Sequence, residues 1–345
     1  MNKRKGILNI VLLMSVFLFT MYYIFEGEDI GELRRYIQKA DSRYWLAAVV
    51  CVVLFIGGES VVIYYMMHTI KQKIGLGHCF LYSFVGFFFS CITPSASGGQ
   101  PAQLYYMRKD KIPMPIATLV LMIVTITYKS VLVMIGFAVM MIRPTNIMYY
   151  LHPVLAWCYL GLILNVVSVS FMLLIVFHPT MAKSILSVVI KILNKMHLVK
   201  QPKRYFDKFE KAMQQYQEVA VYFRTHKLVV WNVLAMTIVQ RLLLFYVTYL
   251  TLRSFHIDEI GMATIVVLQG MISVAVDMLP LPGGMGMSEK LFLAIFTPIC
   301  GNVTLPAMVV SRGLSFYTQL IISAVLTIVA HLVIGKERKK EGKVK

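Results

Sequence analysis

Charged residues are scarce in this sequence. Only 14% of its 345 residues are Asp, Glu, Lys or Arg, whereas 58% are hydrophobic. A water-soluble domain carries charge on about a quarter of its residues, so a soluble globular protein is excluded. Several apolar stretches reach the roughly 18 to 20 residues that cross a hydrocarbon core about 30 Å thick. The sequence therefore predicts one all-α, polytopic membrane domain that comprises residues 1–345.

The signatures of catalytic and cofactor-binding domains are also absent. The sequence has no G-x-x-x-x-G-K-[ST] motif for nucleotide phosphates. No Ser/His/Asp, kinase-type or metal-ligand constellation stands at a useful spacing. The five cysteines lie in or beside apolar stretches without a C-x-x-C pair, so neither a zinc site nor a disulfide framework is indicated. We therefore expect no catalytic residue, no metal and no cofactor.

Positive charge is concentrated in the loops and tails. The net charge is +18, and residues 178–227 alone carry ten Lys or Arg against three acidic residues. Basic loops facing the cytoplasm follow the positive-inside rule, and anionic lipids of the inner leaflet attract them, so nucleic-acid binding is not expected. Residues 178–227 are predicted to form amphipathic helices on the cytoplasmic surface, with a solvated linker as the alternative. The basic tail, residues 336–345, is placed on the same side.

The apolar stretches predict six full spans and two shorter hairpins. Residues 7–25 follow three basic residues but precede no small-residue cleavage site, so they read as a retained span instead of a signal peptide. The other full spans are expected at residues 44–67, 115–142, 154–177, 228–252 and 305–334. Each of two further stretches contains a Pro/Gly-rich break and is predicted to be a re-entrant hairpin: 80–107, and 262–279 with 291–299. This count places every strongly basic segment and both termini in the cytoplasm, in a multi-pass protein of the cell membrane.

The same count indicates an internal symmetry. The first half, residues 1–177, and the second half, residues 228–335, each contain a hairpin between two spans, but the two hairpins enter from opposite faces. The halves are thus predicted to be inverted copies. Paired interrupted segments of this kind indicate a transport site near the middle of the bilayer.

The first hairpin contains the motif TPSASGGQP. Pro94 should break the descending helix, Gly98 and Gly99 permit a tight turn, and Pro101 suits the first position of the ascending helix. That helix would direct backbone N–H groups and a positive dipole end into the membrane, where they attract phosphate or carboxylate. A purely structural turn is the alternative. The candidate substrate-binding residues of this motif are Pro94, Ser95, Ser97, Gly98, Gly99 and Gln100.

The second hairpin contains LPLPGGMGMSE, whose prolines and glycines predict a similar helix break that enters the membrane from the other face. Its candidate substrate-binding residues are Pro282, Gly283, Gly284, Gly286 and Glu289. Ser288 could cap the following helix, and Glu289 in its first turn would oppose the dipole or bind a proton.

Charged residues also stand inside the apolar stretches. The cations are Lys129, Arg241 and Arg312, and the carboxylates are Glu59, Asp277 and Glu289. Each costs about 2.5–3.5 kcal/mol in a membrane unless it is paired or hydrated. Their balance indicates internal pairing, a polar interior, or both, with purely structural ion pairs as the alternative. The cations are candidates for attracting an anionic headgroup, and the carboxylates are candidates for ion or proton coupling.

Two motifs carry a resemblance to a known family. TPSASGGQPAQLYYM and LPLPGGMGMSE, in this order, resemble the flippase-like family, also called the lysylphosphatidylglycerol synthase transmembrane region, which forms the N-terminal half of MprF proteins. The segment RGLSFY, residues 312–317, looks like the last-helix segment of that family. The resemblance implies a flippase for aminoacylated phosphatidylglycerol, whereas other relatives are associated with polyprenyl-linked sugars or other lipids.

Three functions remain open at this level. The first is a flippase or transporter for an anionic, aminoacylated or polyprenyl-linked lipid. The second is a phosphatidylglycerol lysyltransferase that supports resistance to cationic peptides, and only this alternative requires tRNA. In MprF proteins that synthesis belongs to a separate membrane region and a soluble domain, which this sequence lacks. The third is a non-transporting membrane partner of a lipid or cell-wall enzyme. The expected partners are membrane lipids, and a homo-oligomer is compatible with the sequence.

Overall fold

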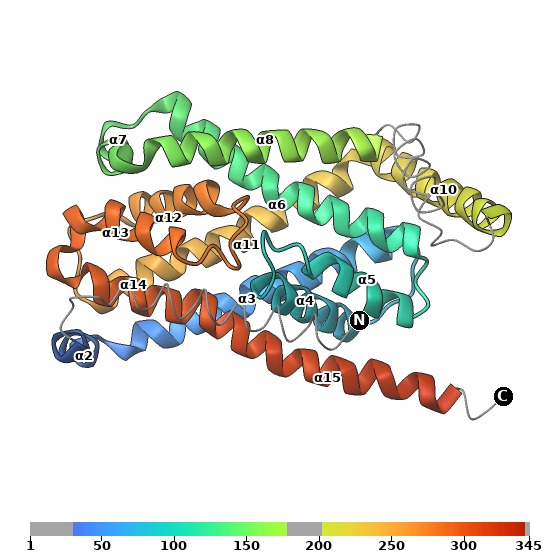
Figure 1. Ribbon diagram of the computed structural model, residues 1–345, viewed down its shortest axis with the longest axis horizontal. Coiled ribbons are helices and arrows are strands. Elements are labelled where there is room, and N and C mark those ends of the chain that lie inside the picture. Colours follow the sequence, from blue (N-terminus) through green and yellow to red (C-terminus); the bar gives the residue numbers. More distant parts are fainter. Residues whose placement is uncertain (1–29, 178–201, 342–345) are drawn as a thin grey trace.

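The structure, a computed structural model, describes residues 30–177 and 202–341. Within these ranges every regular element is a helix. The helices form an elongated bundle in which most of them run along the long axis (Figure 1). The span expected at residues 7–25 and the first part of the basic segment lie outside the described residues.

Five stretches of the described chain are long and apolar enough to cross a membrane. They are Ser42–Thr69 (α3), Met114–Ile142 (α6), Thr145–Val176 (α7 and α8), Lys227–Ser254 (α11) and Met287–Ile334 (α13 to α15). The first four coincide, within a few residues at their ends or by overlap, with the spans predicted at residues 44–67, 115–142, 154–177 and 228–252. Large apolar side chains such as Ile163, Val167 and Phe171 of α8 stay exposed, which suits contact with lipid tails in place of water.

The last span is less regular than predicted. Residues 305–334 divide into helix α14 (Thr304–Arg312), a π-helix (Gly313–Tyr317) and helix α15 (Thr318–Glu341). A π-turn accommodates one extra residue per turn and is frequent at functional sites. Its hydrogen-bond pattern depends on neighbouring helices, so apolar length alone did not reveal it.

Three further helices lie where no span was expected. Helix α2 (Ile30–Lys39) precedes α3, and α7 (Thr145–Leu151) precedes a short 3-10 turn and α8 (Leu155–Phe177). Helix α10 (Pro202–Thr225) forms the described part of the basic segment. Its helical conformation agrees with the amphipathic-helix prediction for that part, while its position on a membrane surface stays a prediction.

Two pairs of short helices contain the predicted breaks. Helices α4 (Leu76–Cys91) and α5 (Gly99–Lys109) form one pair, and α12 (Met262–Val276) and α13 (Met287–Cys300) form the other. The pairs lie toward opposite ends of the bundle, and the loops that connect their helices meet near its centre (Figure 1).

Two capping predictions were wrong. Pro101 is the third residue of α5 and not the first, because the helix already begins at Gly99. Ser288 is the second residue of α13, whose N-cap is Gly286 with φ +82°. A glycine in that conformation turns the chain into the helix without a side-chain cap, so Ser288 is free to bond elsewhere.

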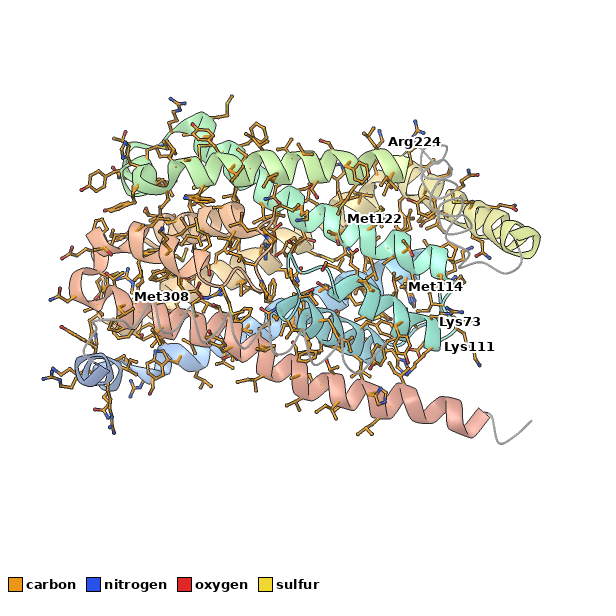
Figure 2. The ribbon with its side chains drawn as sticks, viewed as in Figure 1. Lys73, Lys111, Met114, Met122, Arg224 and Met308 are labelled. Carbon is orange, nitrogen blue, oxygen red and sulfur yellow. The ribbon has the colours of Figure 1, made fainter. Side chains whose placement is uncertain are left out.

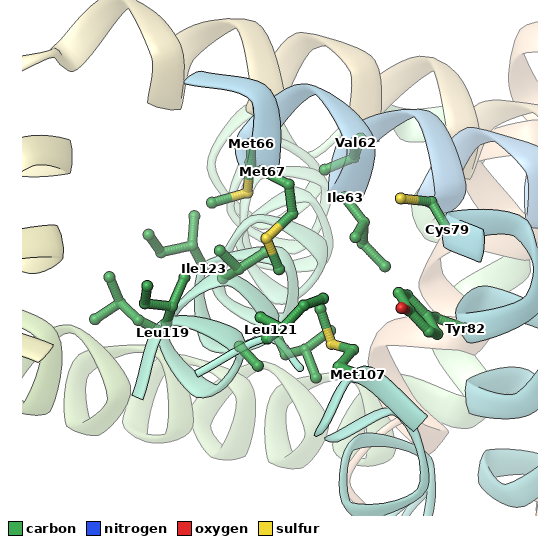
Figure 3. Packing of buried hydrophobic residues seen from close by; sticks show 14 of the residues in the cluster. Val62, Ile63, Met66, Met67, Cys79, Tyr82, Met107, Leu119, Leu121 and Ile123 are labelled. Atoms are coloured by element: carbon green, nitrogen blue, oxygen red, sulfur yellow. The ribbon is translucent and has the colours of Figure 1, made fainter. Parts of the chain in front are cut away.

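The core holds these elements at fixed positions. Its largest buried cluster joins Met66 and Met67 of α3, Tyr82 of α4, Met107 of α5 and Leu119 of α6 (Figure 3). All five residues are fully buried, with 0% of their surface exposed. Because such a close-packed interior leaves little freedom, the short helices cannot shift without repacking it.

Candidate functional site

The two Pro/Gly-rich loops touch each other. Pro94 and Pro282 form an isolated antiparallel bridge, the one β-type pairing within the described residues. Beside it, the Ser95 hydroxyl donates a hydrogen bond of 3.1 Å to the carbonyl oxygen of Leu279, 184 residues away in sequence. The two loops that interrupt the short-helix pairs are thus in direct contact near the centre of the bundle.

The two loops have equivalent backbone turns. In the first, the amides of Ala96 and Ser97 donate to the carbonyls of Thr93 and Pro94; in the second, Gly284 and Met285 donate in the same way to Leu281 and Pro282. Residues in left-handed conformations also occupy equivalent positions. They are Ser95 and Ala96 in the first loop, with φ of 50° and 54°, and Gly283 and Gly284 in the second, with φ of 57° and 68°.

This geometry corrects the role predicted for Gly98 and Gly99. Gly98 has φ −82°, and Gly99 likewise lies outside the left-handed region, so neither makes the turn. They permit close packing instead, because a Cβ on Gly99 would overlap the Ser90 hydroxyl and one on Gly98 would overlap Thr93. The turn falls on Ser95 and Ala96, whose left-handed backbone costs about 1–2 kcal/mol each. Such strain persists only where the surrounding structure enforces it.

A cavity of about 470 Å³ opens beside the joined loops. We call it the central cavity. Its walls come from both loops and from helices α3 to α6, α8, α11 and α12, together with the π-helix and α15. The predicted site residues that line it are Glu59, Ser95, Ser97, Gln100, Lys129, Arg241, Asp277, Gly283, Gly284 and Arg312.

The remaining predicted residues lie just behind that wall. Pro94, Gly98, Gly99, Pro282, Gly286 and Glu289 shape the loops or support the lining residues but do not line the cavity themselves. Glu289, for example, is 0% exposed. The structure therefore brings the predicted set into one region and divides it into lining and supporting positions.

An ion pair ties the second loop to α6. Lys129 donates to the carboxylate of Asp277, and its ammonium also lies 2.9 Å from the Met278 sulfur. Both charged side chains are only 12% exposed. Because breaking a largely buried pair leaves an uncompensated charge, this contact fixes the start of the loop against a long helix.

A second ion pair ties the same loop to α14. The Arg312 Nε donates to Glu289 at 2.7 Å, and its Nη2 donates to the Gly283 carbonyl at 3.0 Å. The other carboxylate oxygen of Glu289 accepts from Ser288 at 3.0 Å. The guanidinium thus binds the turn and the helix that follows it, and this explains the position of Arg312 immediately before the π-helix.

Arg241 has a different environment from the other two cations. It is 3% exposed, and its guanidinium lies 3.5 Å from the centre of the Tyr128 ring. No carboxylate of the described residues forms a salt bridge with it, and its Nε has no hydrogen-bond partner among them. A guanidinium retains its charge in a protein, so the cavity presents a buried cation that no described carboxylate contacts.

Glu59 faces the cavity from α3. Its carboxylate accepts a hydrogen bond of 2.7 Å from the Gln103 amide of α5. Gly86 of α4 makes room for this contact, since a Cβ there would overlap the Gln103 side chain. Nearby, Gln100 donates to Thr125. The sequence identified Glu59 and Gln100, but not Gln103, Thr125 or Tyr128, because uncharged residues inside apolar helices give no distinctive signal.

The lining of the central cavity has the mixed polar and apolar character of a binding site. Within the described residues, no group of three or more His, Cys, Asp or Glu side chains could hold a metal ion. The lining combines hydroxyl and amide donors with fixed charges and an apolar wall. This combination suits an anionic polar group attached to an apolar body.

Comparison with known protein families identifies the family of this chain. The model of the family described as "Lysylphosphatidylglycerol synthase TM region" matches residues 6–323. No curated protein matches the chain.

Proposed function

Because the chain belongs to the lysylphosphatidylglycerol synthase TM region family, a family of multi-pass membrane domains, we propose that it moves a lipid with an anionic headgroup across the cytoplasmic membrane. In this proposal the headgroup occupies the central cavity and the acyl or prenyl chains stay in the surrounding lipid. The main observation in favour of this proposal is that the loops of the two broken helix pairs meet and line one cavity, the central cavity.

The proposal includes the membrane topology predicted from the sequence. It has six spans, two re-entrant hairpins and both termini in the cytoplasm. Two observations support the inverted repeat: the short-helix pairs lie toward opposite ends of the bundle, and their loops have the same hydrogen bonds and the same left-handed positions. A binding site between inverted hairpins is accessible from either face after small movements of the surrounding helices.

The pairing of the charges supports an anionic substrate. Lys129 and Arg312 are engaged by Asp277 and Glu289, whereas Arg241 has no carboxylate partner among the described residues. A phosphate oxygen would provide that partner, since guanidinium groups bind phosphate through strong charge-assisted hydrogen bonds. Ser97 and Gln100 line the same cavity and can donate to the remaining headgroup oxygens.

Glu59 is the carboxylate that we propose for ion or proton coupling. Asp277 and Glu289 each bind a cation, but Glu59 contacts the neutral amide of Gln103. A carboxylate without a cationic partner inside a membrane can gain or lose a proton, which is the property that proton-coupled carriers use.

Reconstitution into liposomes tests the proposal. Vesicles of phosphatidylcholine contain the purified chain and a trace of fluorescent phosphatidylglycerol, and dithionite bleaches only the outer leaflet. The wild-type protein should make the inner-leaflet pool accessible, and fluorescent phosphatidylcholine should move at least tenfold more slowly, because its positive choline disfavours a site around Arg241. Equal rates for both lipids would remove the argument for an anionic headgroup.

The variant Arg241→Gln tests the site itself. It removes the cation that has no carboxylate partner, so phosphatidylglycerol movement should fall at least tenfold. Arg253→Gln is the matched control, since Arg253 lies on the same helix but pairs with Asp258 outside the cavity. If Arg241→Gln folds and moves lipid at the wild-type rate, the cavity assignment is wrong.

The family name favours one alternative, a role in lysylphosphatidylglycerol synthesis. The same vesicles supplied with lysyl-tRNA would reveal lysyl transfer to phosphatidylglycerol as a new lipid on chromatography. Transfer without movement would favour the lysyltransferase. If the vesicles show neither lipid movement nor lysyl transfer, a non-transporting partner of another lipid enzyme would be favoured.

A further inference from the structure

A second hollow, of about 710 Å³, lies at one end of the bundle and shares no lining residue with the central cavity. It is bounded by the turn between α3 and α4, the start of α4, the end of α5, the turn into α6 and Ile334 of α15. Figure 2 shows Lys73 and Lys111 beside each other at this end, next to Met114 at the start of α6. We call this hollow the basic end pocket.

Positive charge dominates the lining of the basic end pocket. Among the described residues that line it, the cations are Lys73, Arg108, Lys109 and Lys111, and the one acidic residue is Asp110. Asp110 already accepts hydrogen bonds from His78, at 2.7 Å, and from Tyr82, and its side chain is only 10% exposed. The carboxylate is thus engaged by two neighbours from α4, and among the described residues it forms no salt bridge with Lys73, Arg108 or Lys109.

The cations reach this position through the ends of the helices. Lys109 is held over the rings of Tyr105 and Tyr106, 4.6 and 5.2 Å from their centres. Arg108 and Lys73 are exposed, and Lys111, with φ 64°, lies in the left-handed turn that follows α5. Four cations from two separate turns therefore line one concave surface.

The N-terminus of α4 adds to the positive potential of the pocket. Helix α4 begins here with Gly75 as an N-cap that makes no side-chain hydrogen bond, and its first turn contains no acidic residue. Its exposed N–H groups consequently favour an anion. At the end of α5 the carbonyl oxygens of Tyr106, Met107 and Arg108 accept hydrogen bonds from the backbone of Asp110, Ile112 and Lys111, so these oxygens are already bonded within the chain.

We infer that the basic end pocket binds a phosphate group carrying two or more negative charges, such as a phosphomonoester or a diphosphate. Several lysines with exposed helix N–H groups suit such a group better than a single carboxylate, because each adds a point charge toward the same centre. The pocket lies at the end of helices that cross the membrane, where lipid headgroups are found. The phosphate can therefore come from a lipid headgroup or from a soluble phosphate compound.

Binding to the full-length protein in phosphatidylcholine nanodiscs distinguishes these sources. Native mass spectrometry would count bound dioctanoyl phosphatidic acid, a phosphomonoester lipid, against dioctanoyl phosphatidylcholine. Parallel samples would contain inorganic pyrophosphate as the soluble competitor. At equal concentrations of the two dioctanoyl lipids, the wild-type protein should bind one more molecule of phosphatidic acid than of phosphatidylcholine.

The variant Lys73→Gln/Arg108→Gln removes two exposed cations of the pocket. Its affinity for phosphatidic acid should fall at least tenfold, since each cation near an anionic headgroup contributes roughly a fivefold factor. Lys71→Gln/Lys290→Gln is the matched control, because it removes two exposed lysines that do not line the pocket. The control should bind as the wild type does.

The outcomes separate the sources. If micromolar pyrophosphate displaces the lipid from the wild type, and this displacement disappears in the pocket variant, the site would be assigned to soluble phosphates. Retention of the lipid against pyrophosphate would assign it to lipid headgroups. An equal loss in the control, or no preference of the wild type for phosphatidic acid, would overturn the inference. None of these readouts requires lipid movement, so they are independent of the proposed function.

Discussion

Pro94 and Pro282 lie opposite each other in an antiparallel bridge, although each belongs to a different short-helix pair. Proline has no N–H group to donate, so the bridge depends on their neighbours and on contacts such as that between Ser95 and Leu279. The contact places two helix breaks at one point and creates the wall of the central cavity.

A cysteine pair tests this contact directly. In antiparallel bridges the Cα atoms lie about 4.5–5.5 Å apart, within the range that a disulfide spans. Pro94→Cys/Pro282→Cys should therefore form a disulfide under mild oxidation, detected by mass spectrometry of the linked peptides. Because Cys91 lines the same cavity, the single variant Pro282→Cys is the control for unintended pairing. Failure of the double variant to cross-link in a folded protein would contradict the bridge.

Gly283 is required for both its conformation and its lack of a side chain. Its φ is +57°, and a Cβ would overlap the Phe316 ring. Gly283→Ala should lower the free energy of unfolding by about 1–2 kcal/mol from backbone strain, with a further 1–3 kcal/mol or so from overpacking.

Gly301→Ala provides the matched control for this variant. Gly301 has φ +53°, but a Cβ there would meet nothing within 4 Å. Thermal unfolding in detergent should therefore show a smaller loss than for Gly283→Ala. Equal losses would show that Phe316 moves aside without cost.

The Lys129–Asp277 pair should show strong energetic coupling. Lys129→Met or Asp277→Asn alone leaves one charge uncompensated in a largely buried setting, which costs about 3–5 kcal/mol. The double variant should recover part of that loss. Stability measurements on the four proteins of this cycle give the coupling energy.

The Arg253–Asp258 pair calibrates that cycle. Asp258 has a side chain that is 73% exposed, compared with 12% for Asp277. The same substitutions at this exposed pair should give a coupling of about 1 kcal/mol or less. Similar coupling in the two cycles would mean that water reaches Lys129 and Asp277 freely.

Arg312→Lys tests the geometry of the guanidinium. Arg312 donates to Glu289 through Nε and to the Gly283 carbonyl through Nη2. One ammonium group cannot reproduce both directions, so stability should fall by about 1.5–3 kcal/mol although the charge is kept. In the liposome assay, slower lipid movement should accompany this loss. A variant with wild-type stability would show that charge alone is sufficient there.

The sequence predicted most of what lies along single helices. Apolar length located α3, α6, α8 and α11 within a few residues, and the Pro/Gly motifs located both breaks between short helices. The reason is that a membrane span requires length and apolarity, and a helix break requires proline or glycine, so these features are local. The π-helix in the last span escaped detection, because its extra residue is accommodated by neighbouring helices and leaves no mark in the composition.

The pairing of the six charged residues was decided by the tertiary structure. The sequence showed three cations and three carboxylates in apolar surroundings, but six charges can pair in several ways. The fold joins Lys129 to Asp277 and Arg312 to Glu289, and it leaves Arg241 without a salt bridge to any described carboxylate. It also transferred the left-handed turn of the first loop from the expected glycines to Ser95 and Ala96. Composition and local propensity determined which residues had to be hidden from lipid, whereas only the packing of helices distant in sequence determined which of them meet.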